Sequence, residues 1–211
     1  MRWLEKTGAA LLLALGLAGC GSDGGSTPKV TVSEVEPGLY VASTGSADAL
    51  VVGRYFAAQD GSRLLALDDA QGRATALYRR SATGAWQAVP SSGQEVSLPL
   101  LQSHALPVPK ADLASLAGRY AARLPDGTVA AFVLSNQGVL SAGSTPCKLS
   151  GQATSGSLPG TLALTLGSSG CSGLPARSTG VLAVDGERAP AAFRLLADDG
   201  RQIVDLLAFA E

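Results

Sequence analysis

Apolar and polar residues alternate in short runs along most of this chain, and turn residues separate the runs. The clearest run covers residues 161–166, where leucines at every second position share one face of an extended strand. Glycine, often with aspartate, recurs between the runs about every 8–12 residues, which is typical of antiparallel hairpins. The pattern therefore predicts an all-β protein built as an antiparallel meander.

The runs fall into two series. The first predicts an N-terminal β module of about five strands, at residues 39–43, 49–57, 63–67, 74–80 and 85–89. The second predicts eight strands, at residues 119–124, 128–135, 139–142, 147–152, 161–166, 179–184, 191–197 and 202–209. Eight strands suffice to close a small barrel, whose interior holds side chains or one small ligand. We expect such a barrel in the C-terminal half.

Residues 91–111 interrupt the pattern of short strands. They contain Pro99, Pro107 and Pro109, and their apolar residues show neither helical nor strand periodicity. This segment is interpreted as a linker or long crossover, followed by a helical turn at 111–117. The expected organisation is a signal segment at 1–19, an anchor and tether at 20–36, the N-terminal module at 37–90, the linker at 91–111 and the barrel at 112–211. Residues 28–37 have the pattern of an edge strand or an extended lead-in.

A secretion signal is predicted at the start of the chain. Arg2 and Lys6 precede an apolar run at 9–17, which is far shorter than the roughly 20 residues that a membrane-spanning helix needs. A buried helix of a globular domain is the less favoured interpretation. Residues 17–20, Leu-Ala-Gly-Cys, close this run and resemble the lipobox of bacterial lipoproteins.

The lipobox resemblance implies that Cys20 is acylated, typically with palmitate, and becomes the first residue of the mature chain. It further implies a bacterial envelope protein held at a membrane by its lipid. Gly21 stands where an aspartate would signal inner-membrane retention, so the same resemblance favours the outer membrane, facing the periplasm. Residues 21–27 are polar and glycine-rich, as expected of a flexible tether.

The other two cysteines, Cys147 and Cys171, are expected to form a disulfide bond. Export places them in an oxidising compartment, where an even pair is usually joined. Closing this loop stabilises the fold by about 3.5 kcal/mol in the chain-entropy model. A metal pair is the alternative, but the chain offers few further cysteine or histidine ligands.

The start of the second series resembles lipocalin-like and broader calycin barrels. A short helical turn leads into Gly118 and Tyr120, and eight short strands follow. In that family the aromatic residue plugs the closed end of the barrel, and an arginine from a late strand packs over it. The resemblance assigns these roles to Tyr120 and to Arg194 or Arg201, although lipocalins carry tryptophan where this chain has tyrosine. It implies a carrier of a small apolar ligand, or a periplasmic protease inhibitor, as possible functions.

The two series open alike, with Gly-Leu-Tyr at residues 38–40 and Gly-Arg-Tyr at residues 118–120. Residues 67–72 and 134–138 also resemble one another, since both lead into a turn glycine. A duplication is one hypothesis for these similarities. Chance is the alternative, because glycine and tyrosine recur in any β protein.

Candidate catalytic chemistry is sparse. His104 is the single histidine. A serine-histidine-aspartate site would need it, together with Ser103 and a distant carboxylate, but a solvated loop histidine is favoured.

The pairs at residues 68–69 and 198–199, both Asp-Asp, precede glycines and are interpreted as turn residues rather than acid–base or calcium sites. Asp205 lies inside a predicted strand, where it either pairs with an arginine or faces solvent.

Arg79, Arg80 and Trp86 lie in adjacent predicted strands. A cation–π contact between them is favoured over a phosphate or sugar site.

The formal net charge of −1 and the lack of a basic patch argue against a nucleic-acid partner. We therefore expect a non-enzymatic envelope lipoprotein without a cofactor or metal, with a binding or structural role and an envelope protein or small apolar ligand as partner. In a carrier, small residues would line the barrel interior, whereas Leu and Phe would fill it in a structural protein.

Overall fold

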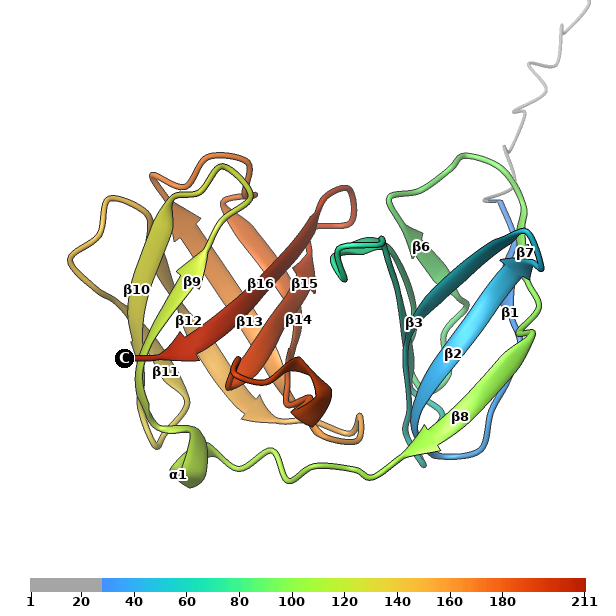
Figure 1. Ribbon diagram of the computed structural model, residues 1–211, viewed down its shortest axis with the longest axis horizontal. Coiled ribbons are helices and arrows are strands. Elements are labelled where there is room, and N and C mark those ends of the chain that lie inside the picture. Colours follow the sequence, from blue (N-terminus) through green and yellow to red (C-terminus); the bar gives the residue numbers. More distant parts are fainter. Residues whose placement is uncertain (1–27) are drawn as a thin grey trace, which may run out of the picture.

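The computed structural model describes residues 28–211, and it confirms the all-β prediction (Figure 1). A closed eight-stranded antiparallel barrel forms the C-terminal part, and a six-stranded sheet lies N-terminal to it. A further two-stranded sheet belongs to the N-terminal part. The predicted signal segment, Cys20 and residues 21–27 of the tether lie outside the described residues.

The N-terminal module is a six-stranded antiparallel sheet with a small sheet on one face. Its five predicted strands are all present, and a sixth joins them. The strand order is β6-β5-β4-β3-β2-β8, with β2 (Gly38–Ser46), β3 (Ala49–Ala57), β4 (Arg63–Asp68), β5 (Ala74–Arg80), β6 (Gln87–Val89) and β8 (Gln102–Leu106). The small sheet pairs β1 (Val30–Val32) with β7 (Val96–Leu98) in parallel. Val32 and Leu98 from this pair pack with Tyr55 and Leu65 of the large sheet, which buries its outer face.

The segment predicted as a linker, 91–111, is largely part of the N-terminal module. It contains both β7 and β8, and β8 pairs with β2 so that Val41 lies opposite His104. The prolines do not prevent this pairing because they flank the strands: Pro99 lies between β7 and β8, and Pro107 and Pro109 follow β8. Only the residues after β8 connect the two modules.

All eight strands predicted for the barrel are present. The chain enters through a one-turn helix, α1 (Leu113–Leu116), and a 3-10 turn, η1 (Gly186–Arg188), precedes the last hairpin. The strands are β9 (Gly118–Arg123), β10 (Val129–Leu134), β11 (Val139–Ala142), β12 (Lys148–Ser155), β13 (Thr161–Ser169), β14 (Arg177–Ala183), β15 (Phe193–Asp198) and β16 (Ile203–Ala210). Neighbours in sequence pair around the ring, and β16 closes it by pairing with β9.

The barrel interior is filled by large apolar side chains. Strand alternation sends every second residue inward, so the leucines of β13 at positions 162, 164 and 166 all point into the interior. The ring of Phe193 lies 4.6 Å from that of Tyr120 between centroids, and Phe132 stacks on Tyr120 at 5.8 Å. Ten leucines and the two phenylalanines occur among the buried residues of this cluster. Leucine and phenylalanine, rather than small residues, therefore fill the interior, which is the composition expected of a structural protein rather than of a carrier.

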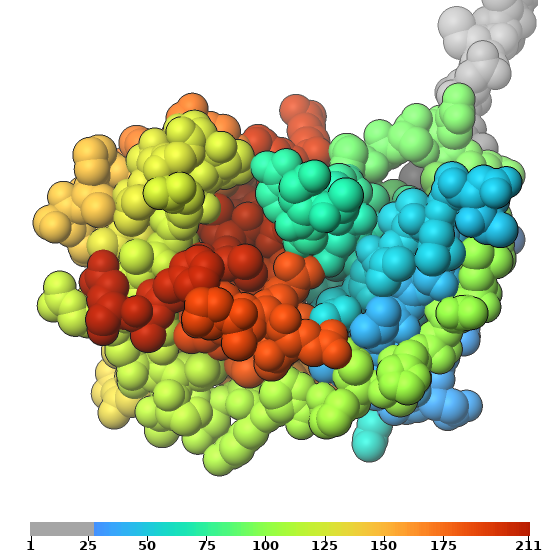
Figure 2. Space-filling model, viewed as in Figure 1, coloured from blue at the N-terminus to red at the C-terminus, as the bar shows by residue number. Residues whose placement is uncertain are grey.

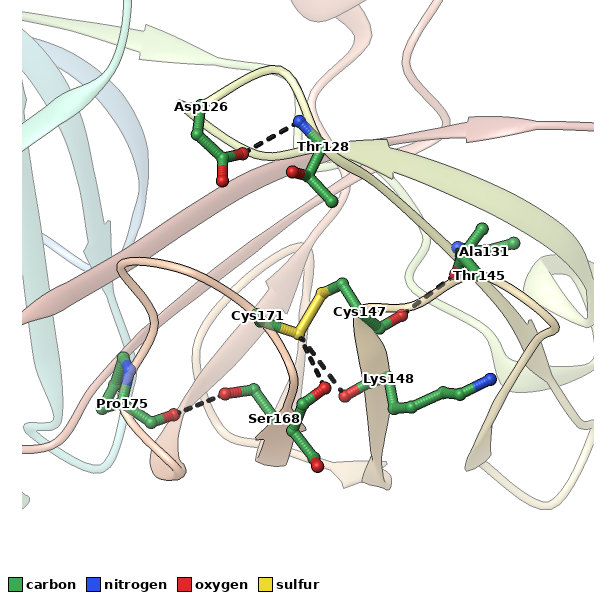
Figure 3. Close-up of a disulfide and its surroundings, with 10 residues drawn as sticks. Asp126, Thr128, Ala131, Thr145, Cys147, Lys148, Ser168, Cys171 and Pro175 are labelled. Carbon is green, nitrogen blue, oxygen red and sulfur yellow. Dashed lines mark hydrogen bonds between the residues drawn. A yellow bond between two sulfur atoms is a disulfide. The ribbon is translucent and has the colours of Figure 1, made fainter.

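The predicted disulfide is present and joins Cys147 to Cys171 (Figure 3). Cys147 immediately precedes β12, and Cys171 lies just after β13, the strand paired with β12. The bond therefore ties the beginning of one strand to the end of its neighbour. Cys147 is fully buried in the barrel core and Cys171 is partly buried against it, so the bridge ties the loop after β13 to the core.

The two modules pack against each other through an apolar layer. Val181 of β14 and Leu196 of β15 point outward from the barrel and contact the inner face of the six-stranded sheet, where Phe56 and Leu77 are buried. The hairpin between β4 and β5 lies against the C-terminal part of the barrel, as the blue-green and red surfaces show in Figure 2. The described residues therefore form two modules with a shared, buried interface.

Candidate functional site: the cleft between the modules

A cluster of ion pairs borders the apolar layer between the modules. Arg194 of β15 is 3% exposed, and its guanidinium donates to Asp205 of β16 at 2.6 Å and to Asp68 of β4 at 2.9 Å. Arg188 of η1 also binds Asp68, and its Nη1 donates to the Gly72 carbonyl at 2.7 Å. Each module thus supplies a charged group that the other module neutralises.

Burial by itself lowers the pKa of Arg194, but hydrogen bonds and the negative charge of Asp205, and then of Asp68, outweigh that effect. The pKa of Arg194 consequently lies above its already high usual value, so the side chain stays charged. Asp205 completes the link between modules, because its Oδ2 accepts a hydrogen bond from the Ala74 amide of β5 at 2.6 Å. Of the two interpretations of Asp205, pairing with an arginine is the one observed.

Both Asp-Asp pairs divide into one turn residue and one interface residue. Asp69 Oδ1 accepts from the amides of residues 71 and 73, and Asp199 Oδ1 accepts from those of residues 201 and 202, as expected of turn aspartates. These amide donors are the main reason that the pKa values of Asp69 and Asp199 lie below their usual range. Asp68 and Asp198 end their strands instead, and each binds an arginine of the other module. The turn interpretation therefore holds for Asp69 and Asp199, and for Asp198 through the Gly200 amide, but it misses the ion pairs that Asp68 and Asp198 make across the modules.

The second ion pair across the modules joins Arg79 of β5 to Asp198 of β15. Arg79 Nη2 donates to Asp198 Oδ1 at 3.0 Å, and the amide of Gly200 donates to the same oxygen at 2.8 Å. The Asp198 side chain is 2% exposed, whereas that of Arg79 is 38% exposed. Arg79 therefore lies at the boundary between the buried interface and solvent.

Arg79 lines several neighbouring hollows in the surface between the modules. One, of about 570 Å³, lies over the outer face of β12–β14 and is bordered by Thr165, Arg177 and Asp199. A second, of about 400 Å³, enters between the modules beside Leu77 and Val181. Both volumes fall in the range of small-molecule sites. We refer to these hollows, which share Arg79 and Asp198 in their walls, as the inter-module cleft.

The residues expected to close the barrel lie in different places. Tyr120 is inside the barrel, packs beside Gly118, and donates through its hydroxyl to the Leu116 carbonyl of α1 at 2.7 Å. Arg194 lies on the outer face of β15, since Phe193 and residue 195 on either side point inward. Arg201 is exposed in the turn between β15 and β16. Arg194 therefore does not pack over Tyr120 at the closed end of the barrel, as the resemblance implied. Its guanidinium is bound at the module interface instead.

The structure also places the other candidate residues that were named from the sequence. His104 lies on strand β8 rather than in a loop and is exposed. Arg80 places its guanidinium carbon 5.3 Å from the Trp86 ring centroid, which confirms the cation–π contact. Gly38 lies against the ring of Tyr40 much as Gly118 lies against that of Tyr120, a local similarity that the duplication hypothesis anticipates. Duplication itself stays a prediction.

Sequence reasoning named Arg79 and Arg194 in other roles, and it did not name Arg54 or Arg188. Arg54 of β3 binds Asp185 at 2.9 Å, just before η1 of the other module, and also Glu187 within η1. A charged residue within an otherwise apolar strand was the available signal, and it was used only for Asp205. Partners more than 100 residues away cannot be identified from such a pattern.

No family model, curated protein or solved structure matched this chain in the comparisons made. Among residues 28–211, no helix is long and apolar enough to cross a membrane. The same residues contain no group of three or more histidine, cysteine, aspartate or glutamate side chains placed to hold a metal ion. The function therefore has to be argued from the cleft and the packing themselves.

Proposed function

We propose that this protein is a lipid-anchored, non-enzymatic component of a bacterial envelope that binds its ligand or partner in the inter-module cleft. The observation that carries this proposal is the contrast between a barrel filled by leucine and phenylalanine and hollows of several hundred Å³ around Arg79. A filled barrel serves as a scaffold, and the concave, partly polar surface beside it is the default binding site.

The cleft favours binding over catalysis. The carboxylates nearest to it are already occupied, Asp198 by Arg79 and the Gly200 amide, and Asp199 by two turn amides. A general acid or base would need a carboxylate free to exchange a proton with a substrate. The single histidine of the chain, His104, lies on β8 and lines none of the hollows around Arg79.

If the protein is a carrier, we propose that its ligand binds in the cleft and not inside the barrel. A lipocalin-like carrier needs an internal cavity, whereas the interior of this barrel is occupied by side chains such as Phe132, Phe193 and Leu206. The part of the interface next to Leu77 and Val181 is apolar and hollow instead. Carriage of a small ligand stays within the proposal, but at a different site from the one the resemblance implied.

The anchor is tested by metabolic labelling. Cells expressing the full chain and fed radioactive palmitate should yield a labelled protein in the membrane fraction. Cys20→Ser should abolish the label and release the protein into the soluble fraction, because the lipid is proposed to be attached to Cys20. Cys147→Ser is the matched control, which removes a cysteine of the disulfide and should leave labelling unchanged. Equal labelling of wild type and Cys20→Ser would contradict the anchor.

A further inference from the structure

The hollow that enters between the modules has an apolar part and a charged part. Leu64, Leu77, Val181 and Leu196, which pack together in the interface, form the apolar part of its wall with Leu158. Arg63, Arg79, Arg80 and Asp198 form the charged part, and Arg63 and Arg80 already bind Glu34. Its volume of about 400 Å³ lies at the lower end of the range for small-molecule sites. An aliphatic group entering this hollow would leave water for an apolar surface, which is favourable in proportion to the area buried.

A cation stands at the rim of the same hollow. Arg79 Nη2 is bound to Asp198, but Arg79 Nε is buried and has no hydrogen-bond partner among the described residues. Since the Arg79 side chain is 38% exposed and only its Nη2 donates to another described residue, the exposed part of its guanidinium can donate to a ligand in the hollow.

The chemistry that satisfies this donor is an anionic oxygen. Guanidinium groups bind carboxylates through short, charge-assisted hydrogen bonds, often two in parallel. Beyond Arg79 lies the hollow bordered by Thr165, Thr179 and Arg177, so the acid end would lie toward hydroxyl groups, a second cation and solvent. Asp198 and Asp199 also border this hollow, but Asp198 is paired with Arg79 and Asp199 accepts from turn amides. Apolar lining on one side of Arg79 and polar lining on the other match a molecule with a tail and a charged head.

We propose that the inter-module cleft binds a small amphipathic carboxylic acid, with its aliphatic tail on the apolar wall of the hollow between the modules, beside Leu77 and Val181, and its carboxylate on Arg79. This inference rests on the proposed function, which places binding in the cleft, and adds the chemical class of the ligand. No covalent step is involved.

The test is calorimetric titration of the full chain carrying Cys20→Ser with octanoate, and with octanamide as a neutral probe of similar shape. Octanoate should bind saturably, and octanamide at least about 10-fold more weakly, because it forms no charge-assisted hydrogen bond with Arg79. Equal affinity for the two probes, or no octanoate binding, would overturn the assignment of an acid.

Three variants locate the site. Arg79→Gln should weaken octanoate binding at least about 10-fold, but it also leaves buried Asp198 without its cation, so its fold must be checked by circular dichroism. Ala85→Trp changes an exposed residue at the mouth of the hollow and should block binding while leaving the fold intact. Arg119→Gln on the outer face of β9 is the control and should bind octanoate like the parent chain. Unchanged binding in folded Arg79→Gln or in Ala85→Trp would overturn the proposal.

Failure of this inference can be told apart from failure of the proposed function. If octanoate does not bind, but a ligand from cells is captured at Ala85, the cleft is the binding site and the ligand class is wrong. If octanoate does not bind and nothing is captured there, the proposed function fails as well.

Discussion

Arg194→Met should lower the free energy of unfolding by about 3–5 kcal/mol, the usual cost of removing one partner from a buried ion pair. The loss arises because Asp205 then keeps only the Ala74 amide as a partner, while Asp68 keeps Arg188. Two carboxylates are left in a poorly hydrated interface with one cation fewer. Urea denaturation of the variant and the parent chain measures the difference.

A local readout separates this effect from a general loss of packing. The amide of Ala74 donates to Asp205 across the modules, so its hydrogen exchange should become faster in Arg194→Met than that of amides in the barrel core. Arg119→Met is the matched control, because its side chain is 76% exposed and its ion pair to Glu211 is long, at 3.8 Å. That control should change stability by no more than about 0.5 kcal/mol. A similar small change for Arg194→Met would show that the ion pairs do not hold the modules together.

Phe193→Ala should destabilise the protein by about 3–5 kcal/mol, the typical cost of truncating a fully buried aromatic residue. Phe193 is 2% exposed and packs on Tyr120 and Phe132 inside the barrel. Its removal loses the transfer free energy of the ring and leaves a cavity that the surrounding strands, closed into a ring, cannot easily collapse. Thermal and chemical denaturation both measure the loss.

The control for the barrel core is Val133→Ala on the outer face of β10, where the side chain is 39% exposed. It should cost much less, because little apolar surface is returned to water. If Phe193→Ala costs no more than Val133→Ala, the barrel interior is not tightly packed. A ligand cavity in the barrel, as the lipocalin-like resemblance implied, would then have to be reconsidered.

Most of the fold was predictable because its signals are local. Alternation such as that at 161–166, with glycine turns between runs, identified all eight barrel strands and five of the six strands in the larger sheet. Strand β8 was missed because its sequence, Gln-Ser-His-Ala-Leu, shows little alternation and lies between prolines. It forms because the backbone of β2 offers an edge to pair with, and that edge is defined by the tertiary structure.

The cleft was much less predictable. Its defining contacts join residues far apart in sequence, since the residue numbers differ by 119 for Arg79 and Asp198 and by 126 for Asp68 and Arg194. Asp205 was singled out because a charge within a strand requires a partner, but the sequence does not show which arginine that is. The disulfide was easier, since only two cysteines remained once Cys20 was assigned to the anchor.

The most direct test of binding between the modules, rather than in the barrel, is photo-cross-linking in living cells. A benzoylphenylalanine placed at Ala85, at the mouth of the hollow, should capture a ligand or partner that mass spectrometry detects as a defined adduct. The same residue placed at Val133, on the outer face of the barrel, is the control and should capture nothing specific. A defined adduct at position 85 alone is the predicted result. No adduct at position 85, or the same adducts at both positions, would contradict the account.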